Sequence, residues 1–241
     1  MDRTRLIILL ILSLSFPSYL SAQRQVSADV EVKTVMDGKV ATVTKSVYCT
    51  IEGRLVTVFH SPNEYYALSN SKGEFKIWLP SRNEAYSDVD ESASSRGELV
   101  SIFMSGSVND LGLGSFGYTL KSTATEDGLL KRTFVHKSSS DAAEVEVVYQ
   151  DFLPIFCEYR SSSGAVKGRT YFSNYAEFKR FKFPCRVTEI SYGERRDSTV
   201  VRTIYSNVKV DVDDPAFHFE IPSDAKAVTL PADPASRRRA R

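Results

Sequence analysis

Apolar and polar side chains alternate along most of this chain, and this period of two constrains the possible folds more than any other feature of the sequence. Successive side chains of a β-strand point to opposite faces, so alternation predicts a strand that buries one face. The alternating segments are also rich in the β-branched and aromatic residues that strands favour. They cover residues 30–36, 47–51, 75–79, 145–149, 155–159, 188–192 and 200–212, and the even-numbered residues of 200–212 are expected to share one face.

Turn signals that end in glycine lie between or beside these segments. Glycine adopts positive φ angles without steric cost, which tight turns between strands require. The turn pairs are Asp37-Gly38, Glu52-Gly53, Lys72-Gly73, Asp127-Gly128, Ser163-Gly164 and Tyr192-Gly193. The sequence therefore predicts a mainly β protein, built as a meander of antiparallel strands with short connections.

One stretch departs from the alternation. Within Ser92–Met104 the apolar residues Leu99, Ile102 and Phe103 have the spacing of a single helix face, which predicts one amphipathic helix. A glycine-rich loop, 106–117, follows it. An antiparallel sheet of this length must close into a barrel, fold into a sandwich, or stay open with the helix and loop covering its apolar concave face. The third arrangement creates a binding cleft.

The N-terminal residues 1–22 have the features of a secretory signal peptide. Arg3 and Arg5 precede an apolar run, Leu6–Leu14, and Ser21-Ala22 offers a cleavage site. The run is far shorter than the roughly 20 apolar residues of a membrane-spanning helix. We expect cleavage after Ala22 and export to the periplasm, with a retained anchor as the alternative.

The remainder is expected to form one β domain, 23–230, because undivided β domains reach this length and 42% hydrophobic residues suffice for a core. Residues 231–241 contain two prolines and four arginines, and we expect a disordered Arg-rich tail there. Contact of this tail with anionic lipid or nucleic acid is the alternative. Basic and acidic residues number 31 and 30 in the whole chain, so the body predicts no nucleic-acid surface.

The sequence contains no set of residues typical of catalysis or of metal or cofactor binding. His60, His136 and His218 are far apart, and none has a cysteine or carboxylate cluster at ligand spacing. Residues 112–117 spell GxGxxG, but they follow the predicted helix instead of opening one after a strand, which argues against dinucleotide binding. We expect no catalytic residue, no metal site, no cofactor and no enzymatic activity.

The chain has three cysteines, Cys49, Cys157 and Cys185, whose spacings match no zinc pattern. An odd count in an oxidising compartment allows at most one internal disulfide. Each lies in an apolar, strand-like context, which favours small buried hydrophobic residues. Whether two of them form a disulfide stays open at this point.

Several motifs point to a known family. In residues 56–66 a strand ends in a Pro-Asn pair before an aromatic residue, and in 72–80 a turn around glycine leads to an apolar-Trp strand. Residues 178–187 contain a Phe-Pro strand start, and 204–210 lead to F-x-F-x-x-P within 215–225. Together these segments resemble the periplasmic outer-membrane lipoprotein carriers of the LolA type.

This resemblance implies an open antiparallel half-barrel with a helical lid over an apolar concave face. It also implies that the cleft takes up lipoprotein acyl chains or another lipid, and that the carrier works between inner-membrane donor and outer-membrane acceptor proteins. In the family, F-x-F-x-x-P belongs to a terminal strand pair that closes the sheet. We expect a periplasmic monomer.

Two features depart from the family pattern. The family begins with an amphipathic helix, whereas Val26–Val35 enters a strand at once. The family also places an arginine directly before the Pro-Asn pair, where it latches the lid, and this chain has Ser61 there. A relative with a different ligand is therefore the alternative within the resemblance.

The expected cleft wall lies around the Pro-Asn corner. Phe59 and Tyr65 flank that corner, where proline restricts the backbone to a strand end or edge. Phe75 and Ile77 lie two residues apart and must share a face. In a register shifted by one, Lys76 and Trp78 would point inward instead.

The predicted helix is expected to be the lid, with an ordinary core helix as the alternative. A rival function is an envelope sensor or protein-interaction module that binds a protein partner through the same open sheet. The expected ligand-contacting residues are Phe59, Tyr65, Phe75, Ile77, Leu99, Ile102 and Phe103.

Overall fold

The computed structural model describes residues 25–90, 94–139, 141–179, 181–193 and 197–229. The expected signal peptide 1–22 and Arg-rich tail 231–241 lie outside the described residues. No helix within the described part of the chain is long and apolar enough to cross a membrane.

Fourteen strands are present in the described residues. Their bounds are β1 (Gln25–Met36), β2 (Lys39–Thr50), β3 (Leu55–Ser61), β4 (Tyr65–Ser69), β5 (Glu74–Leu79), β6 (Glu84–Val89), β7 (Thr119–Glu126), β8 (Leu129–Val135), β9 (Glu144–Gln150), β10 (Leu153–Arg160), β11 (Val166–Phe178), β12 (Phe181–Tyr192), β13 (Ser198–Val210) and β14 (Lys226–Ala227). The helical elements are α2 (Leu99–Met104) and the 3-10 turns η1 (Pro80–Arg82), η3 (Ser95–Gly97), η4 (Ser107–Asn109), η5 (Leu113–Phe116) and η6 (Pro215–His218).

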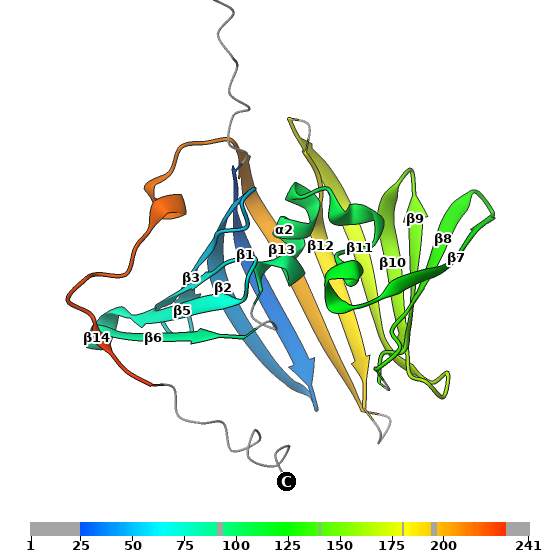
Figure 1. The fold of residues 1–241 in the computed structure, drawn as a ribbon, viewed down its shortest axis with the longest axis horizontal. Coiled ribbons are helices and arrows are strands. Elements are labelled where there is room, and N and C mark those ends of the chain that lie inside the picture. Colours follow the sequence, from blue (N-terminus) through cyan, green and yellow to red (C-terminus); the bar gives the residue numbers. More distant parts are fainter. Residues whose placement is uncertain (1–24, 91–93, 140, 180, 194–196, 230–241) are drawn as a thin grey trace, which may run out of the picture.

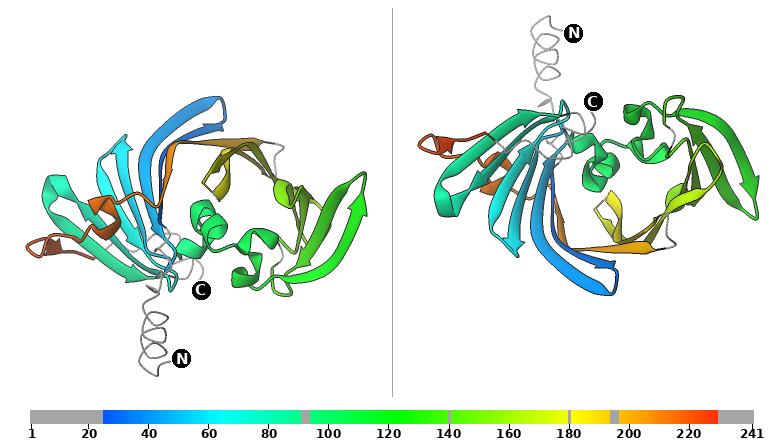
Figure 2. Two further views of the ribbon diagram at one scale, coloured as in Figure 1. Left: turned by 90° about the horizontal axis from the view of Figure 1, so that it is seen from above. Right: turned by 90° about the horizontal axis from the view of Figure 1, so that it is seen from below.

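All strands belong to one sheet, in the order β14-β6-β5-β4-β3-β2-β1-β13-β12-β11-β10-β9-β8-β7. Pairing is antiparallel throughout except between β14 and β6, and β1 joins the two meanders by pairing with both β2 and β13. The edge strands β14 and β7 do not pair with each other, so the sheet stays open, curved around the helical segment (Figures 1 and 2). The predicted mainly β, open, antiparallel architecture is confirmed.

Each of the six glycine turn pairs connects consecutive strands, as the sequence predicts. Gly53 illustrates why glycine is needed. Its φ is +86°, and a Cβ added there would lie 2.9 Å from Cβ of Ser71 on the neighbouring turn. A larger residue at this position would strain the backbone and displace that turn.

The α-helix is shorter than Ser92–Met104. Of that range, 92–93 lie outside the described residues, and η3 precedes the α-helical residues, which begin only at Leu99. The side chain of Ser94 accepts a hydrogen bond from the backbone N–H of Arg96, which favours a separate turn. Glu98, whose backbone is extended, then separates η3 from α2. Gly97, the last residue of η3, packs closely on Phe116, since a Cβ there would lie 3.1 Å from the Phe116 ring.

The even-numbered residues of 200–212 do not share one face, contrary to the sequence expectation. The pairing of β1 with β13 shifts between Ser27 and Asp29, opposite Asn207, whose φ is +49°. Ile204 therefore faces away from α2, whereas Val208 and Val210 pack against the core beneath it. A β-bulge inserts one residue into a strand and reverses the alternation beyond it.

The C-terminal arm, 211–225, also differs from expectation, because F-x-F-x-x-P does not close the sheet as a strand. Pro215 starts the turn η6, and Asp214 accepts a hydrogen bond from Ala216 N–H. Phe217 and Phe219 of this arm pack on the face opposite α2, against the aromatic residues Tyr48, Tyr66 and Trp78. Phe217 is buried there, and Phe219 is half-buried. Pairing resumes only at β14.

We predict that Phe217→Ala detaches this arm. Phe217 is only 1% exposed, and its ring lies 5.4 Å from the Tyr48 ring. Removing the ring should therefore weaken the attachment of the arm to the sheet by about 3 kcal/mol of free energy. Limited proteolysis should cut within 211–225 much faster in the variant. Val212→Ala, a change at an exposed residue of the same arm, should leave the cleavage rate unchanged. Equal cleavage of the two variants would contradict the prediction.

Candidate functional site

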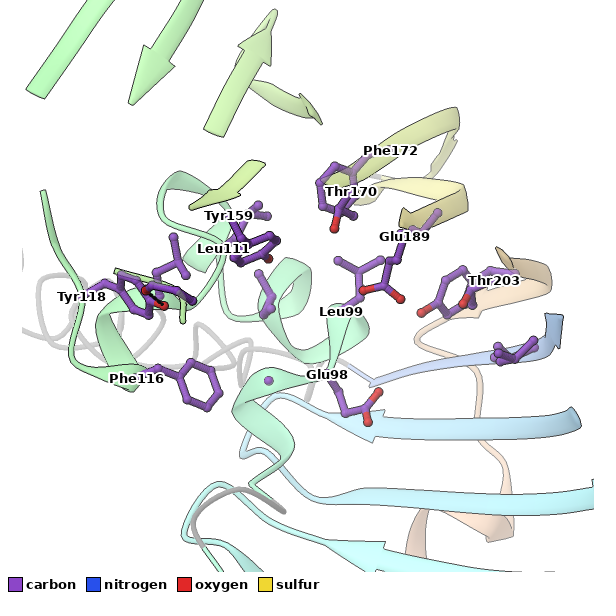
Figure 3. A pocket seen from close by; sticks show the side chains of 18 of the residues that line it. Glu98, Leu99, Leu111, Phe116, Tyr118, Tyr159, Thr170, Phe172, Glu189 and Thr203 are labelled. Carbon is purple, nitrogen blue, oxygen red and sulfur yellow. Dashed lines mark hydrogen bonds between the residues drawn. The ribbon is translucent and has the colours of Figure 1, made fainter. Parts of the chain in front are cut away.

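A cavity of about 570 Å³ lies between the sheet and the segment that contains η3, α2 and η5 (Figure 3). Its walls come from β1, β2, β10, β11, β12, β13 and Ala142 on one side and from residues 97–118 on the other. Most of the lining is apolar. The apolar residues are Val30, Val32, Leu99, Ile102, Leu111, Leu113, Phe116, Ala142, Phe172 and Val187.

Strand pairing places one row of lining residues across four strands. Val32 of β1 lies opposite Thr203 of β13, which in turn lies opposite Val187 of β12. Val187 lies opposite Phe172 of β11. Directly paired residues share a face of the sheet, so this row forms a continuous, rigid floor.

The next row of the floor is polar. Glu189 of β12 lies opposite Thr170 of β11, and both line the cavity. Glu98, at the start of α2, brings a second carboxylate to the same space (Figure 3). Neither glutamate side chain forms a hydrogen bond or an ion pair with another described residue. Both are exposed to the open cavity.

The environment of this space changes the titration of Glu189 and of the tyrosines around it. Loss of hydration raises the pKa of the Glu189 carboxyl above its ordinary value, and repulsion from Glu98 raises it further. Burial, followed by the charges of Glu98 and Glu189, raises the pKa of the Tyr205 hydroxyl. Burial likewise raises the pKa of Tyr159, with a smaller contribution from Glu189. The site therefore concentrates negative charge in a partly dehydrated space.

We predict that Glu189→Gln stabilises the protein at neutral pH. Because its pKa is raised on folding, the Glu189 carboxyl stabilises the folded state only below its ordinary pKa, and this contribution is lost as the pH rises through the raised value. The gain should stay below about 1 kcal/mol, because the carboxyl is exposed and screened. Urea unfolding at neutral and acidic pH measures it. A gain that grows on acidification would contradict the assignment.

The structure separates the predicted lid residues into two groups. Leu99 and Ile102 line the cavity. Phe103 does not, since its ring packs 5.3 Å from the Phe183 ring and 6.4 Å from the Tyr175 ring. Val100 and Met104 are buried in the same cluster, so α2 is anchored to the sheet.

The predicted wall residues share one face of β3, β4 and β5 but do not line the cavity. The rings of Phe59 and Tyr65 stack at 4.0 Å, and Ile77 lies opposite Ala67, two residues along from Tyr65. Phe75 lies on this face too, since it is two residues from Ile77. Lys45 connects this surface to the cavity: it lies opposite Phe59, with Nζ 5.5 Å from the Phe59 ring centre, and lines the cavity.

Burial suppresses the reactivity of two of the three thiols. Cys49, Cys157 and Cys185 are unpaired, and burial raises the pKa of both Cys49 and Cys157 to about 12, which keeps them protonated at neutral pH. Within the described ranges, no group of three or more metal-ligating side chains comes together. His60 contacts the Ser46 hydroxyl, and the His136 ring packs against Tyr118.

No protein-family model matches the chain, and no curated protein matches its sequence. Several solved structures nevertheless share its fold. A LolA superfamily protein from Nitrosomonas europaea matches with a TM-score of 0.55 and 14% identity, over 84% of this chain and 91% of that one. A DUF1329 family protein from Desulfovibrio piger matches with a TM-score of 0.56 and 13% identity, over 90% of this chain and 98% of that one.

A third solved structure is a candidate outer membrane lipoprotein-sorting protein domain from Vibrio parahaemolyticus. It matches with a TM-score of 0.54 and 12% identity, over 80% of this chain and 88% of that one. The LolA-type resemblance seen in the sequence motifs is thus confirmed for the fold. At identities this low, the structural similarity shows the shared fold alone, and the function has to be argued from the site.

Proposed function

We propose that the protein is a periplasmic carrier that holds lipid acyl chains in the cavity between α2 and the sheet, for transfer towards the outer membrane. The observation that supports this most is the cavity itself, with its volume of about 570 Å³ and its largely apolar lining. Small-molecule sites commonly measure about 300 to 1,000 Å³. Two proteins of the same fold, a LolA superfamily protein and a candidate lipoprotein-sorting domain, also support the proposal.

The rigid floor makes such binding energetically feasible. Moving one methylene group out of water contributes about 0.8 kcal/mol, so ten contribute about 8 kcal/mol. Association costs about 4 to 15 kcal/mol, and a preformed site lowers this cost. The row Val32, Thr203, Val187 and Phe172 is preformed by strand pairing. Apolar contacts also suit a carrier of several different cargoes.

In this proposal residues 97–118 act as the lid. The end of the lid around Phe116 opens, because it lies furthest from the buried residues of α2. Phe103 and Met104 are both less than 10% exposed, whereas Phe116 is 44% exposed at the cavity. Gly112 and Gly117, with positive φ angles, bracket the turn that carries Phe116. An acyl chain would enter where the lid is held least.

We predict that Phe116→Ala speeds both uptake and release of an acyl-chain probe by a few-fold, because it removes the side chain that partly covers the entrance. Stopped-flow fluorescence with a fluorescent fatty-acyl probe gives both rates. Phe152→Ala, a change at a residue that is 82% exposed and outside the cavity, serves as the control. Unchanged rates in Phe116→Ala would place the entrance elsewhere.

Organic extraction of the purified protein, followed by mass spectrometry, tests the function itself. The proposal predicts co-purifying lipid, and uptake of an added acyl-chain probe after the lipid has been removed. Protein that is free of lipid and takes up no probe would overturn it. That result would favour the rival protein-interaction module.

A further inference from the structure

The cavity carries a charge arrangement that acyl chains alone do not require. Glu98 and Glu189 face the same space, and neither has a cation or hydrogen-bond donor as a partner among the described residues. Carboxylates left unpaired in a partly dehydrated, largely apolar site lower the stability of the fold. If Glu98 and Glu189 served only to stabilise the fold, we would expect a cation or a hydrogen-bond donor beside them.

Thr170 supplies an independent observation. Its side chain lies on β11 directly opposite Glu189, lines the cavity and is only 6% exposed. Its hydroxyl forms no hydrogen bond with any described residue, and its oxygen is accessible from the cavity, since Arg132 Nε is the one fully buried side-chain atom without a partner in the described part of the chain. Figure 3 shows the Thr170 oxygen directed into the cavity, towards Glu189.

The cationic side chain in the cavity lining does not neutralise this pair. Lys45 lines the cavity from β2, but its ammonium lies over the Phe59 ring and forms no ion pair with Glu98 or Glu189. Tyr159 and Tyr205 lie close enough to feel the carboxylates, Tyr118 lines the same cavity, and Cys49 lies near Glu98. Burial raises the pKa of all four groups, so they are neutral at physiological pH. The polar end of the cavity therefore has a net negative charge.

We propose that the ligand of this cavity is an amphiphile whose head carries a protonated primary amine, held between the carboxylates of Glu98 and Glu189, with the Thr170 hydroxyl as a further acceptor. This inference rests on the proposed function and specifies its ligand. A primary ammonium has three N–H donors, which matches three oxygen-bearing side chains. Hydrogen bonds between charged groups are roughly twice as strong as neutral ones, so the head adds selectivity to the apolar contact of the chain.

The same arrangement acts against anionic amphiphiles. A fatty acid or phosphate head would bring a third negative charge to Glu98 and Glu189, and like charges in a partly dehydrated site repel strongly. The apolar floor would accept any acyl chain, whereas the polar row discriminates between heads.

Titration calorimetry with three probes that share one chain tests the proposal, using dodecylammonium, dodecanol and dodecanoate below their micelle-forming concentrations. We expect dodecylammonium to bind about tenfold more tightly than dodecanol, and dodecanoate to bind most weakly. Glu98→Gln and Glu189→Gln should each remove most of this preference while leaving dodecanol binding unchanged. Thr170→Val, which keeps the shape and removes the hydroxyl, should weaken dodecylammonium binding by a few-fold.

Glu31→Gln is the matched control, since it removes a carboxylate from the opposite face of the sheet, where Glu31 pairs with Lys33. It should leave all three affinities unchanged. Equal binding of the three probes, or a preference for dodecanoate, would overturn the amine assignment and leave the carrier function standing. If none of the probes binds, the carrier function and this inference both fail.

Discussion

Thr203→Trp is expected to lower the affinity for an acyl-chain probe by about a hundredfold while the fold is retained. Thr203 lies in the middle of the cavity floor, between Val32 and Val187. An indole ring there occupies space that about four methylene groups would use, and losing their burial at about 0.8 kcal/mol each costs about 3 kcal/mol. Threonine and tryptophan both favour strands, so β13 should tolerate the change. Fluorescence titration measures the affinity.

Arg202→Trp provides the control for this change. Arg202 is the preceding residue of β13, is exposed and faces the opposite side of the sheet. Adding the same ring there should leave the affinity within a factor of two or so of the unchanged protein. If both variants lost binding equally, the effect would come from the strand and not from the cavity.

Phe183→Ala should destabilise the protein by about 3 to 5 kcal/mol, the range for truncating a buried phenylalanine. Phe183 is 1% exposed, and its ring lies 5.3 Å from Phe103 of α2 and 4.9 Å from Tyr205 of β13. Its side chain therefore holds α2 on the sheet from below. Urea unfolding followed by circular dichroism measures the loss of unfolding free energy.

Phe152→Ala removes the same side chain from an exposed position and should change the unfolding free energy by no more than about 0.5 kcal/mol. A small effect of Phe183→Ala, close to that of Phe152→Ala, would show that α2 is held loosely. In that case the whole helix, and not only the turn around Phe116, would act as the lid.

The strands and turns could be predicted from the sequence because both depend on local signals. Alternation within a strand and glycine at positive φ need no knowledge of distant residues. Gly38 and Gly128, for example, have φ angles of +72° and +78° at the expected turns. Short connections then account for the order of β1 to β6 and of β7 to β13, whereas the pairing of β1 with β13 joins distant parts of the chain.

The faces of the strands depend on distant partners and were harder to predict. In 188–192 the alternating Thr188, Ile190 and Tyr192 suggest the inner face, yet Val187 and Glu189 line the cavity. The register with β11 and β13 decides this orientation. The bulge at Asn207 reverses the alternation within β13 for a similar reason, because local apolar content does not reveal an inserted residue.

The cavity itself was only partly foreseeable. Leu99 and Ile102 could be found from helical spacing, since residues three apart share a helix face. Thr170 and Thr203 carry no such signal, because an isolated threonine in a strand is ordinary. Glu189 could have attracted notice as a carboxylate at an alternate position of a strand with buried neighbours, but its meeting with Glu98 depends on the fold.

The most direct test of the carrier assignment is photocrosslinking with dodecylammonium that carries a diazirine in its chain, followed by peptide mapping. The account predicts adducts on β11, β12 and β13 and on residues 97–118, with strong reduction by Thr203→Trp. Adducts confined to the opposite face of the sheet, beside Tyr48 and Phe217, or adducts that Thr203→Trp leaves unchanged, would contradict it.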